Sequence, residues 1–341
     1  MIKIFKKKPY IIAEIGANHN GSIGIAKKTI SLAKKSGCDA VKFQSWDESL
    51  ISKKIYEKNL NLLREVKKYK LNFKKLKILR KFSKKKSIDF GTTIFNEKEL
   101  KEALSLKCNF IKIASMDINN LYLLKKVAKI KEKVIISTGT ATEKEIKLAS
   151  NIFHREKKKN ITFLHCLTLY PPKDLNIINL KNIDLIKKIT NFPSGYSDHS
   201  TLKEAPLIAT SLGATVIEKH FTINKNLKGW DHKISANFQE MYELNKSCKI
   251  VNAIIGKDKK IISKDEKKMS KIMRRGIYAI KNIKKNEILS TKNILLQRPE
   301  TKLGANFYHT ILGKKAKKNI KENSSIKLND LAGKIKILKK N

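Results

Sequence analysis

The chain has 341 residues, 41% of them hydrophobic, and its 75 Lys and Arg against 30 Asp and Glu give a formal net charge of +45 at pH 7. No apolar run approaches the ~20 residues that span a bilayer, and the first residues lack the apolar stretch of a signal peptide, which argues against a membrane-spanning or secreted protein and for a cytoplasmic one. The length suits one α/β barrel with a small appendage.

Short β-rich segments recur along the first part of the chain, and each is followed by a helical pattern of apolar residues. An example of the helical pattern is Ile23, Ala26, Ile30 and Ala33, which ends before Gly37. Strands that alternate with helices predict a parallel sheet, and this number of units in about 220 residues predicts a closed (β/α)8 TIM barrel. The expected strands are residues 10–16, 40–45, 88–93, 110–115, 134–139, 161–166, 194–199 and 215–221.

The remainder of the chain has a different pattern. Residues 256–273 are dense in Lys and Asp with little apolar periodicity, which predicts a linker. Beyond them, residues 275–280 and 294–298 are expected strands, and the turn-rich segments 282–288 and 319–326 resemble each other. We therefore predict a barrel domain at residues 1–255, a linker at 256–273 and a compact β-rich domain at 274–336.

The high charge and the cysteines indicate little about partners. Only six of the basic residues are Arg, and the Lys residues are spread along the whole chain, whereas a nucleic-acid surface concentrates charge and uses Arg. Compositional bias is the better interpretation, so we expect neither a specific nucleic acid nor a membrane as partner. Cys38, Cys108, Cys166 and Cys248 show no CxxC spacing, which fits reduced thiols in a cytosolic enzyme.

Polar residues stand at the carboxyl ends of the expected strands, where the active site of a TIM barrel lies. Inward positions of such a barrel are normally Val, Ile or Leu, and a charged side chain there is costly unless it is paired or contacts a ligand. The pattern therefore predicts a ligand site. The polar residues are Glu14, Lys42, Gln44, Thr92, Thr93, Lys112, Ser115, Asp117, Ser137, Thr168, Tyr170, Ser197, Asp198, His199, Glu218 and His220.

Lys42 and Lys112 are the strongest anion-binding candidates because both lie inside strand-like segments. An oxygen-rich anion such as a phosphate-carboxylate would neutralise both, and nearby Ser and Thr hydroxyls suit phosphate oxygens. Structural ion pairing is the alternative for each lysine, and a Schiff-base lysine is a further chemical alternative.

His199 and His220 end neighbouring strand-like segments and are 21 residues apart, about one βα unit. Two imidazoles at adjacent strand ends could share one divalent metal that acts as a Lewis acid on a carbonyl. The alternative is a pair of satisfied core histidines. His19, in a Gly/Asn loop, is either a third ligand or a turn or substrate contact. For His165 and Cys166, a packed strand end is favoured over a nucleophilic cysteine.

Seven segments in order resemble the sialic acid synthase family, which includes N-acetylneuraminate, legionaminate and pseudaminate synthases. The segment from Arg274 resembles the SAF (antifreeze-like, β-clip) domain of that family, so the similarity runs over nearly the whole chain. The seven segments are AEIGANHNG at 13–21, VKFQ at 41–44, KIAS at 112–115, STG at 137–139, HCLTLYP at 165–171, GYSDH at 195–199 and EKHF at 218–221.

The resemblance implies a transferase that condenses phosphoenolpyruvate with an N-acylated hexose and water, giving a nine-carbon 2-keto sugar acid and phosphate. The hexose would be N-acetylmannosamine or a 2,4-diacetamido or 6-deoxy relative. It also implies Mn²⁺ or Mg²⁺ bound by His199 and His220, and a domain-swapped homodimer.

The family's site residues match positions of this chain. Lys42, Lys112, Ser115, Ser137, Ser197 and Thr93 match phosphoenolpyruvate contacts, and Glu14, Gln44, Tyr170 and Asp231 match positions near the sugar or metal. Glu14 or Asp117 could move the proton of the attacking water. Arg298 matches an SAF-domain arginine that reaches into the partner protomer's barrel to bind the sugar.

The chain also departs from the family pattern. Asp117 stands where some members have Glu, and Thr168, another expected substrate contact, stands where sialic acid enzymes carry Asn. Both departures argue against N-acetylmannosamine itself as the sugar. Asn286 replaces a turn glycine, for which Asn is suited because it tolerates the left-handed backbone conformation. The segment ETKLG at 300–304 departs from the usual glycine just after the proline.

Two other functions compete with this one. Another phosphoenolpyruvate-dependent 3-deoxy-sugar-acid synthase would act on a phosphorylated sugar, and the attached SAF-like domain argues against it. A non-catalytic polyanion-binding protein is suggested by the charge of +45. The mixed polar residues at the strand ends argue against it.

Overall fold

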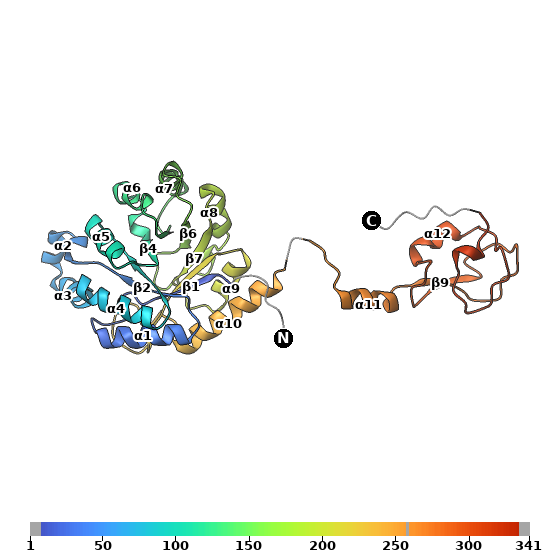
Figure 1. The fold of residues 1–341 in the computed structure, drawn as a ribbon, viewed down its shortest axis with the longest axis horizontal. Helices are drawn as coiled ribbons and strands as arrows, with labels where there is room; N and C mark the ends of the chain where they lie inside the picture. Colours follow the sequence, from blue (N-terminus) through green and yellow to red (C-terminus); the bar gives the residue numbers. More distant parts are fainter. Residues whose placement is uncertain (1–7, 257–258, 334–341) are drawn as a thin grey trace. The chain divides into compact units, whose positions relative to one another are not determined.

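The computed structural model describes residues 8–256 and 259–333, which form two compact units that divide after Gly256 (Figure 1). The first unit is a closed barrel of eight parallel strands in sequence order, and β8 pairs with β1 from Tyr10–Val216 to Glu14–His220. The predicted (β/α)8 barrel is confirmed. The strands are β1 (Tyr10–Glu14), β2 (Ala40–Gln44), β3 (Asp89–Thr93), β4 (Phe110–Ile113), β5 (Lys133–Ser137), β6 (Ile161–Cys166), β7 (Ser194–Asp198) and β8 (Val216–His220).

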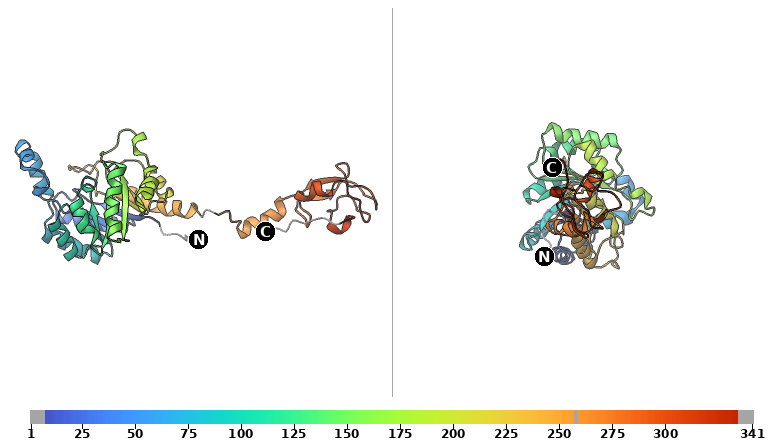
Figure 2. Two further views of the ribbon diagram at one scale, coloured as in Figure 1. Left: turned by 90° about the horizontal axis from the view of Figure 1, so that it is seen from above. Right: turned by 90° about the vertical axis from the view of Figure 1, so that its right-hand side faces the viewer.

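Helices surround the barrel, as the views in Figures 1 and 2 show. Helix α1 (Ile23–Lys35) is typical: Ser22 caps its first turn through Ile25 N, and Ala26, Ile30 and Ala33 are buried. The others are α2 (Lys53–Lys58), α3 (Leu60–Tyr69), α4 (Phe73–Lys85), α5 (Glu97–Ser105), α6 (Leu121–Ala128), α7 (Glu143–Arg155), α8 (Asn182–Thr190), α9 (Glu204–Ser211) and α10 (Phe238–Ile254). Short 3-10 turns span Glu48–Leu50, Ser115–Asp117 and Asn176–Ile178.

The inside of the barrel changes from apolar to polar along the strands. Its apolar layer consists of Ile12, Ala40, Phe110, Ile135, Leu164 and Val216. Gly91 and Gly195 leave room for this layer, because a Cβ at Gly91 would lie 2.2 Å from the Phe110 ring and one at Gly195 would lie 2.4 Å from the Val216 carbonyl oxygen. Side chains two residues apart on a strand share a face, so the next inward positions hold Glu14, Lys42, Lys112, Ser137, Ser197 and Glu218. The apolar layer thus forms the floor beneath a polar site.

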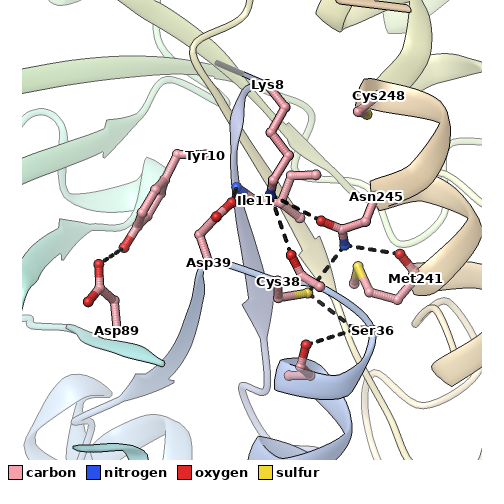
Figure 3. A network of polar contacts seen from close by, with 12 residues as sticks. Lys8, Tyr10, Ile11, Ser36, Cys38, Asp39, Asp89, Met241, Asn245 and Cys248 are labelled. Atoms are coloured by element: carbon pink, nitrogen blue, oxygen red, sulfur yellow. Dashed lines mark hydrogen bonds and ion pairs between the residues drawn. The ribbon is translucent and has the colours of Figure 1, made fainter. Parts of the chain in front are cut away.

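A polar network joins the start and the end of the barrel unit (Figure 3). Asp39, in the turn before β2, forms an ion pair with Lys8 and accepts a hydrogen bond from Ile11 N at 2.8 Å. Lys8 also donates to Asn245 Oδ1 of α10 at 3.2 Å, and Asn245 Nδ2 donates to Met241 O at 3.0 Å. The network therefore fastens the first strand to the last helix at the end of the barrel opposite the site.

The second unit has its own small core. Strands β9 (Gly276–Ala279) and β10 (Ile294–Gln297) pair antiparallel, and α12 (Tyr308–Ile311) and the 3-10 turns Ala305–Phe307 and Leu328–Asp330 complete the unit. Its buried residues include Ile277, Ile294 and Ile320. Asn286 has φ +66°, so the prediction that it serves a left-handed turn is confirmed.

The segment predicted to be a linker contains helix α11 (Lys264–Met273), which the sequence did not lead us to expect. Ser263 caps this helix through Glu266 N, but it buries none of its residues and so lacks a clear apolar period. The predicted boundaries also include residues 1–7, 257–258 and 334–336, which lie outside the described residues. Among residues 8–256 and 259–333, no helix is long and apolar enough to cross a membrane.

Candidate active site

A cavity of about 180 Å³ opens at the carboxyl ends of the barrel strands. It is lined by residues from the strands themselves and from the loops that follow them. The structure therefore brings together most of the residues selected from the sequence. These are Glu14, Lys42, Gln44, Thr93, Lys112, Ser115, Ser137, Thr168, Tyr170, Ser197, His199, His220 and Asp231.

Lys42 lies on the inward face of β2 and is fully enclosed. Its Nζ forms an ion pair with Glu14, donates to Thr93 Oγ1 at 2.9 Å and lies 4.0 Å from Glu218 Oε1. Burial acts to lower the pKa of Lys42, but the carboxylates of Glu14 and Glu218 outweigh it and raise the pKa above its usual value. Lys42 is therefore a permanent cation of the site.

Lys112 occupies the corresponding position on β4. Its Nζ donates to Ser137 Oγ at 2.7 Å and lies 3.5 Å from Glu218 Oε1, which also accepts a hydrogen bond from Ser197 Oγ at 3.1 Å. Burial lowers the pKa of Lys112. Both lysines thus have carboxylate partners within the chain. This is the structural ion pairing that the sequence analysis gave as the alternative to ligand binding. Contact of the lysines with a ligand stays a prediction.

Hydroxyl groups gather on one side of the lysines, around Gly139. Ser115 Oγ accepts a hydrogen bond from Gly139 N at 3.0 Å, and a Cβ at Gly139 would lie 2.5 Å from Thr168 Oγ1. Thr168 Oγ1 is buried and has no hydrogen-bond partner among the described residues. A buried polar atom without a partner is costly, so this cradle suits a ligand that supplies oxygen atoms.

His199 and His220 lie side by side, with ring centroids 5.3 Å apart. His199 Nδ1 lies 2.6 Å from the Leu167 carbonyl oxygen, so Nδ1 carries a proton and Nε2 keeps its lone pair. Burial lowers the pKa of His220 well below its usual value, so its ring is neutral. Its Nδ1 is buried without a hydrogen-bond partner in the described part of the chain and lies 3.7 Å from Asp231 Oδ2.

These donors fit a metal ion that is only partly coordinated by protein. His220 is neutral, as metal binding requires, whereas its interactions with Cys166 raise the pKa of His199, so a metal would bind His199 in competition with a proton. Within the described ranges, no group of three or more His, Cys, Asp and Glu side chains could hold a metal ion. A metal at His199 and His220 would therefore depend on water or substrate for its remaining ligands.

Asp117, a predicted catalytic residue of the barrel, does not line the cavity. Asp117 lies in the 3-10 turn after β4, where its neighbour Met116 faces the cavity instead. Burial raises the pKa of Asp117 to about 6. Arg298 follows β10 in the second unit, where it is exposed and makes no ion pair or hydrogen bond within the described residues.

Other histidines have local roles. The backbone N–H of Gly21 donates a hydrogen bond to His19 Nδ1 at 2.9 Å, so His19 stabilises its own turn. His19 does not line the cavity. His165 Nε2 bonds to the Ile178 carbonyl oxygen at 2.7 Å, so the predicted packing at the strand end holds for His165. Cys166, the next residue, lines the cavity with its Sγ 3.9 Å from His199 Nδ1.

The sequence did not lead us to two features of the site. Glu218 was recognised as a strand-end residue without a role, yet it is the shared partner of both lysines. Its position two residues before His220 on one strand face was the available signal. The second feature is an apolar wall, which comes from loops that have no periodicity. It consists of Trp46, Leu50, Phe95, Met116 and Trp230.

Comparison with known proteins identifies the family. Residues 29–260 match the NeuB family model, and residues 274–332 match the SAF domain. The chain is 40% identical over 333 residues to N,N'-diacetyllegionaminic acid synthase of Campylobacter jejuni, covering 94% of this chain and 99% of the relative. It is 35% identical over 343 residues to the pseudaminic acid synthase of the same organism, covering 95% and 97%.

Similar solved structures support this family assignment. The N-acetylneuraminic acid synthetase of Leptospira borgpetersenii, in complex with citrate, superposes with a TM-score of 0.72 at 35% identity, covering 77% of this chain and 90% of that one. A putative spore coat polysaccharide biosynthesis protein from Chromobacterium violaceum shares the fold, with a TM-score of 0.80 at 23% identity over 96% of this chain and 100% of that one. The chain therefore belongs to the NeuB family, and it is an enzyme of that class of sugar-acid synthases.

Proposed function

We propose that the protein condenses phosphoenolpyruvate with an N-acylated hexose and water, giving a nine-carbon 2-keto sugar acid and phosphate. The observation that carries this proposal is the pair Lys42 and Lys112, both buried on the inward barrel face within 4.0 Å of Glu218 and beside a cluster of hydroxyl groups. A small, highly charged, oxygen-rich anion is the ligand that such a cradle recognises.

In the reaction, the C=C electrons of phosphoenolpyruvate form a bond from its methylene carbon to the aldehyde carbon of the open-chain sugar, the C=O π bond opens onto the aldehyde oxygen, which takes up a proton, and the enol carbon is left electron-poor. Water then adds to the enol carbon, and phosphate leaves by C–O cleavage. Lys42 and Lys112 hold the anion and stabilise the negative charge of the departing phosphate, the kind of electrostatic contribution that is often the largest in catalysis. Glu14, which is held by Lys42 and by Gln44 Nε2 at 3.3 Å, would take the proton of the water.

His199 and His220 would hold Mn²⁺ or Mg²⁺, and the chemistry such an ion supplies is polarisation of the sugar's aldehyde oxygen. The support is that the two rings lie next to each other and that the ring of His220 is neutral. Asp231, whose carboxylate lies 3.7 Å from His220 Nδ1, would orient that ring.

The apolar wall supports a sugar with apolar substituents. Trp46, Leu50, Phe95 and Trp230 face the cavity, where an N-acyl methyl or a 6-deoxy methyl group could be buried. Thr168 replaces the Asn of sialic acid enzymes, and the similar proteins include legionaminic and pseudaminic acid synthases. A 2,4-diacetamido, 6-deoxy hexose is therefore the preferred substrate over N-acetylmannosamine.

We further propose a cytoplasmic, domain-swapped homodimer in which Arg298 of one subunit binds the sugar in the barrel of the other. The resemblance to the family and the exposed guanidinium of Arg298 support this arrangement. The four cysteines are free and buried, which fits a reducing compartment.

A phosphate-release assay tests the proposal. Phosphoenolpyruvate is offered with N-acetylmannosamine, its 6-phosphate, and 2,4-diacetamido and 6-deoxy hexoses, with and without Mn²⁺, and the product is identified by mass spectrometry. We expect release with a diacetamido sugar and loss of release in His220→Ala or after chelation. Release only with the 6-phosphate would favour a synthase of phosphorylated sugars. Absence of phosphate release with every sugar would overturn the proposed substrate class. Full activity after chelation would overturn the metal role.

A further inference from the structure

Behind the two histidines, on the outer face of the same strands, lies a buried ion pair. Asp198 is the last residue of β7 and stands opposite Lys219 in the ladder with β8. Lys219 Nζ lies 2.5 Å from Asp198 Oδ2, and the two side chains are 8% and 0% exposed. Because side chains alternate along a strand, this pair faces the helices, whereas the residues next to it, His199 and His220, face the site.

Every oxygen of the Asp198 carboxylate has a donor. Its Oδ1 accepts hydrogen bonds from Ser200 N at 2.8 Å, Ser200 Oγ at 2.7 Å and Tyr196 OH at 3.1 Å. Lys219 Nζ donates to the Ser200 carbonyl oxygen at 2.8 Å as well as to Asp198. The residues on both sides of His199 are therefore fixed to each other and to the residue immediately before His220.

Stability alone is a poor explanation for such a pair. Removing two charges from water costs several kcal/mol per ion, and replacing a buried ion pair by apolar residues of similar volume is often neutral or stabilising. An apolar pair cannot define the relative orientation and register of the two strand ends, because its contacts are not directional. The network crosses from β7 to β8 at the level of the two histidines, so it fixes how far apart and at what angle the two strand ends deliver their rings.

We propose that Asp198 and Lys219 are positioning residues that set the separation of His199 and His220, and thereby the affinity of this pair for a divalent metal. The inference rests on the metal role in the proposed function. Groups that hydrogen-bond directly to metal ligands typically change metal affinity 10–100-fold when they are removed, and Asp198 and Lys219 would act on the same ligands through the backbone that carries them.

The test is Mn²⁺ binding to the full-length protein, measured by isothermal titration calorimetry without substrates. The variant is D198N/K219M, which removes both charges and so leaves no unpaired buried ion. We expect it to fold, with a circular dichroism spectrum like that of the wild type, and to bind Mn²⁺ about 10–100-fold more weakly. In activity assays, the Mn²⁺ concentration for half-maximal rate should rise by the same factor while the KM for phosphoenolpyruvate stays unchanged.

The matched control is K8M/D39N, which removes an ion pair from the opposite end of the same barrel. It should bind Mn²⁺ like the wild type, whatever its stability. Wild-type Mn²⁺ affinity in D198N/K219M would overturn the positioning role and leave the proposed function intact. Equal weakening in both double variants would also overturn it, because the effect would then follow from general loosening of the barrel. A wild-type enzyme that condenses its substrates but binds no Mn²⁺ or Mg²⁺ would refute the metal role itself.

Discussion

Trp46 and Trp230 pack edge to face at the cavity, with ring centroids 5.4 Å apart and planes inclined by 60°. They are the two tryptophans of the sequence and come from loops far apart in it. Tyr69 of α3 packs on Trp230 from another side, at 4.9 Å. The tryptophan fluorescence of the whole protein therefore originates at the candidate active site.

Binding of the sugar should change this fluorescence, because the ligand would exclude water from Trp230, which is 39% exposed. Trp230→Ala should raise the KM for the sugar about 5–30-fold, the equivalent of ~1–2 kcal/mol of lost aromatic contact, with little effect on the KM for phosphoenolpyruvate. The measurement is a fluorescence titration together with steady-state kinetics. Tyr242→Ala, an exposed aromatic change on α10, is the control and should alter neither. An unchanged sugar KM in Trp230→Ala would show that the wall does not touch the sugar.

Glu14 and Asp117 were equal candidates for the proton transfer, and the structure separates them by position. Glu14 lines the cavity beside Lys42, whereas Asp117 does not line it. Glu14→Gln should lower kcat by about 10²–10⁴. Asp117→Asn should keep kcat within about tenfold of the wild type. The reverse order of effects in single-turnover assays would transfer the proton role to Asp117.

Asp117 should instead affect how the free energy of unfolding depends on pH. Burial raises its pKa to about 6 from an ordinary 3.8, so the neutral form is favoured in the folded state. The stability that this gives is present below pH 3.8 and is lost as the pH rises through 6. As the pH rises from 4 to 8, the free energy of unfolding of Asp117→Asn should therefore increase relative to that of the wild type, as measured by urea denaturation. A difference that does not vary with pH would contradict the raised pKa.

Lys112 should be needed for the anion and not for the sugar. Lys112→Gln removes a buried cation from the cradle and should lower kcat/KM for phosphoenolpyruvate by about 10²–10³. The double variant with Glu218→Gln removes the carboxylate that would otherwise be left unpaired. If the double variant recovered full activity, Lys112 would serve only to neutralise Glu218.

The barrel and its ring of strand-end residues were predictable because they follow rules of period and position. Lys42, Lys112 and His220 could be assigned to one face and one end of the sheet once the strands were known. The ion-pair partners of the lysines required the actual distances, since Glu14 and Glu218 come from strands at opposite ends of the barrel's sequence.

Other features had no sequence signal. The aromatic wall comes from loops, which have no repeating pattern, and the contact between Trp46 and Trp230 joins distant parts of the chain. Helix α11 was missed because Lys, Asp and Glu dominate its ten residues and its few apolar residues lie only in its second half. The turn role of Asn286 was predictable because only a few residue types tolerate a positive φ.

The ion pairs inside the site also bear on how the enzyme responds to its medium. Lys42 and Lys112 already have built-in counterions in Glu14 and Glu218, so an anion that bound to the lysines, as we propose, would compete with these carboxylates and displace few salt ions from solution. Binding to a dense polyanion behaves differently, since it weakens steeply as salt is added. We therefore expect the affinity for a small anionic substrate at this site to depend less steeply on ionic strength than the binding of a polyanion would, while the overall charge of +45 adds an attraction that salt screens.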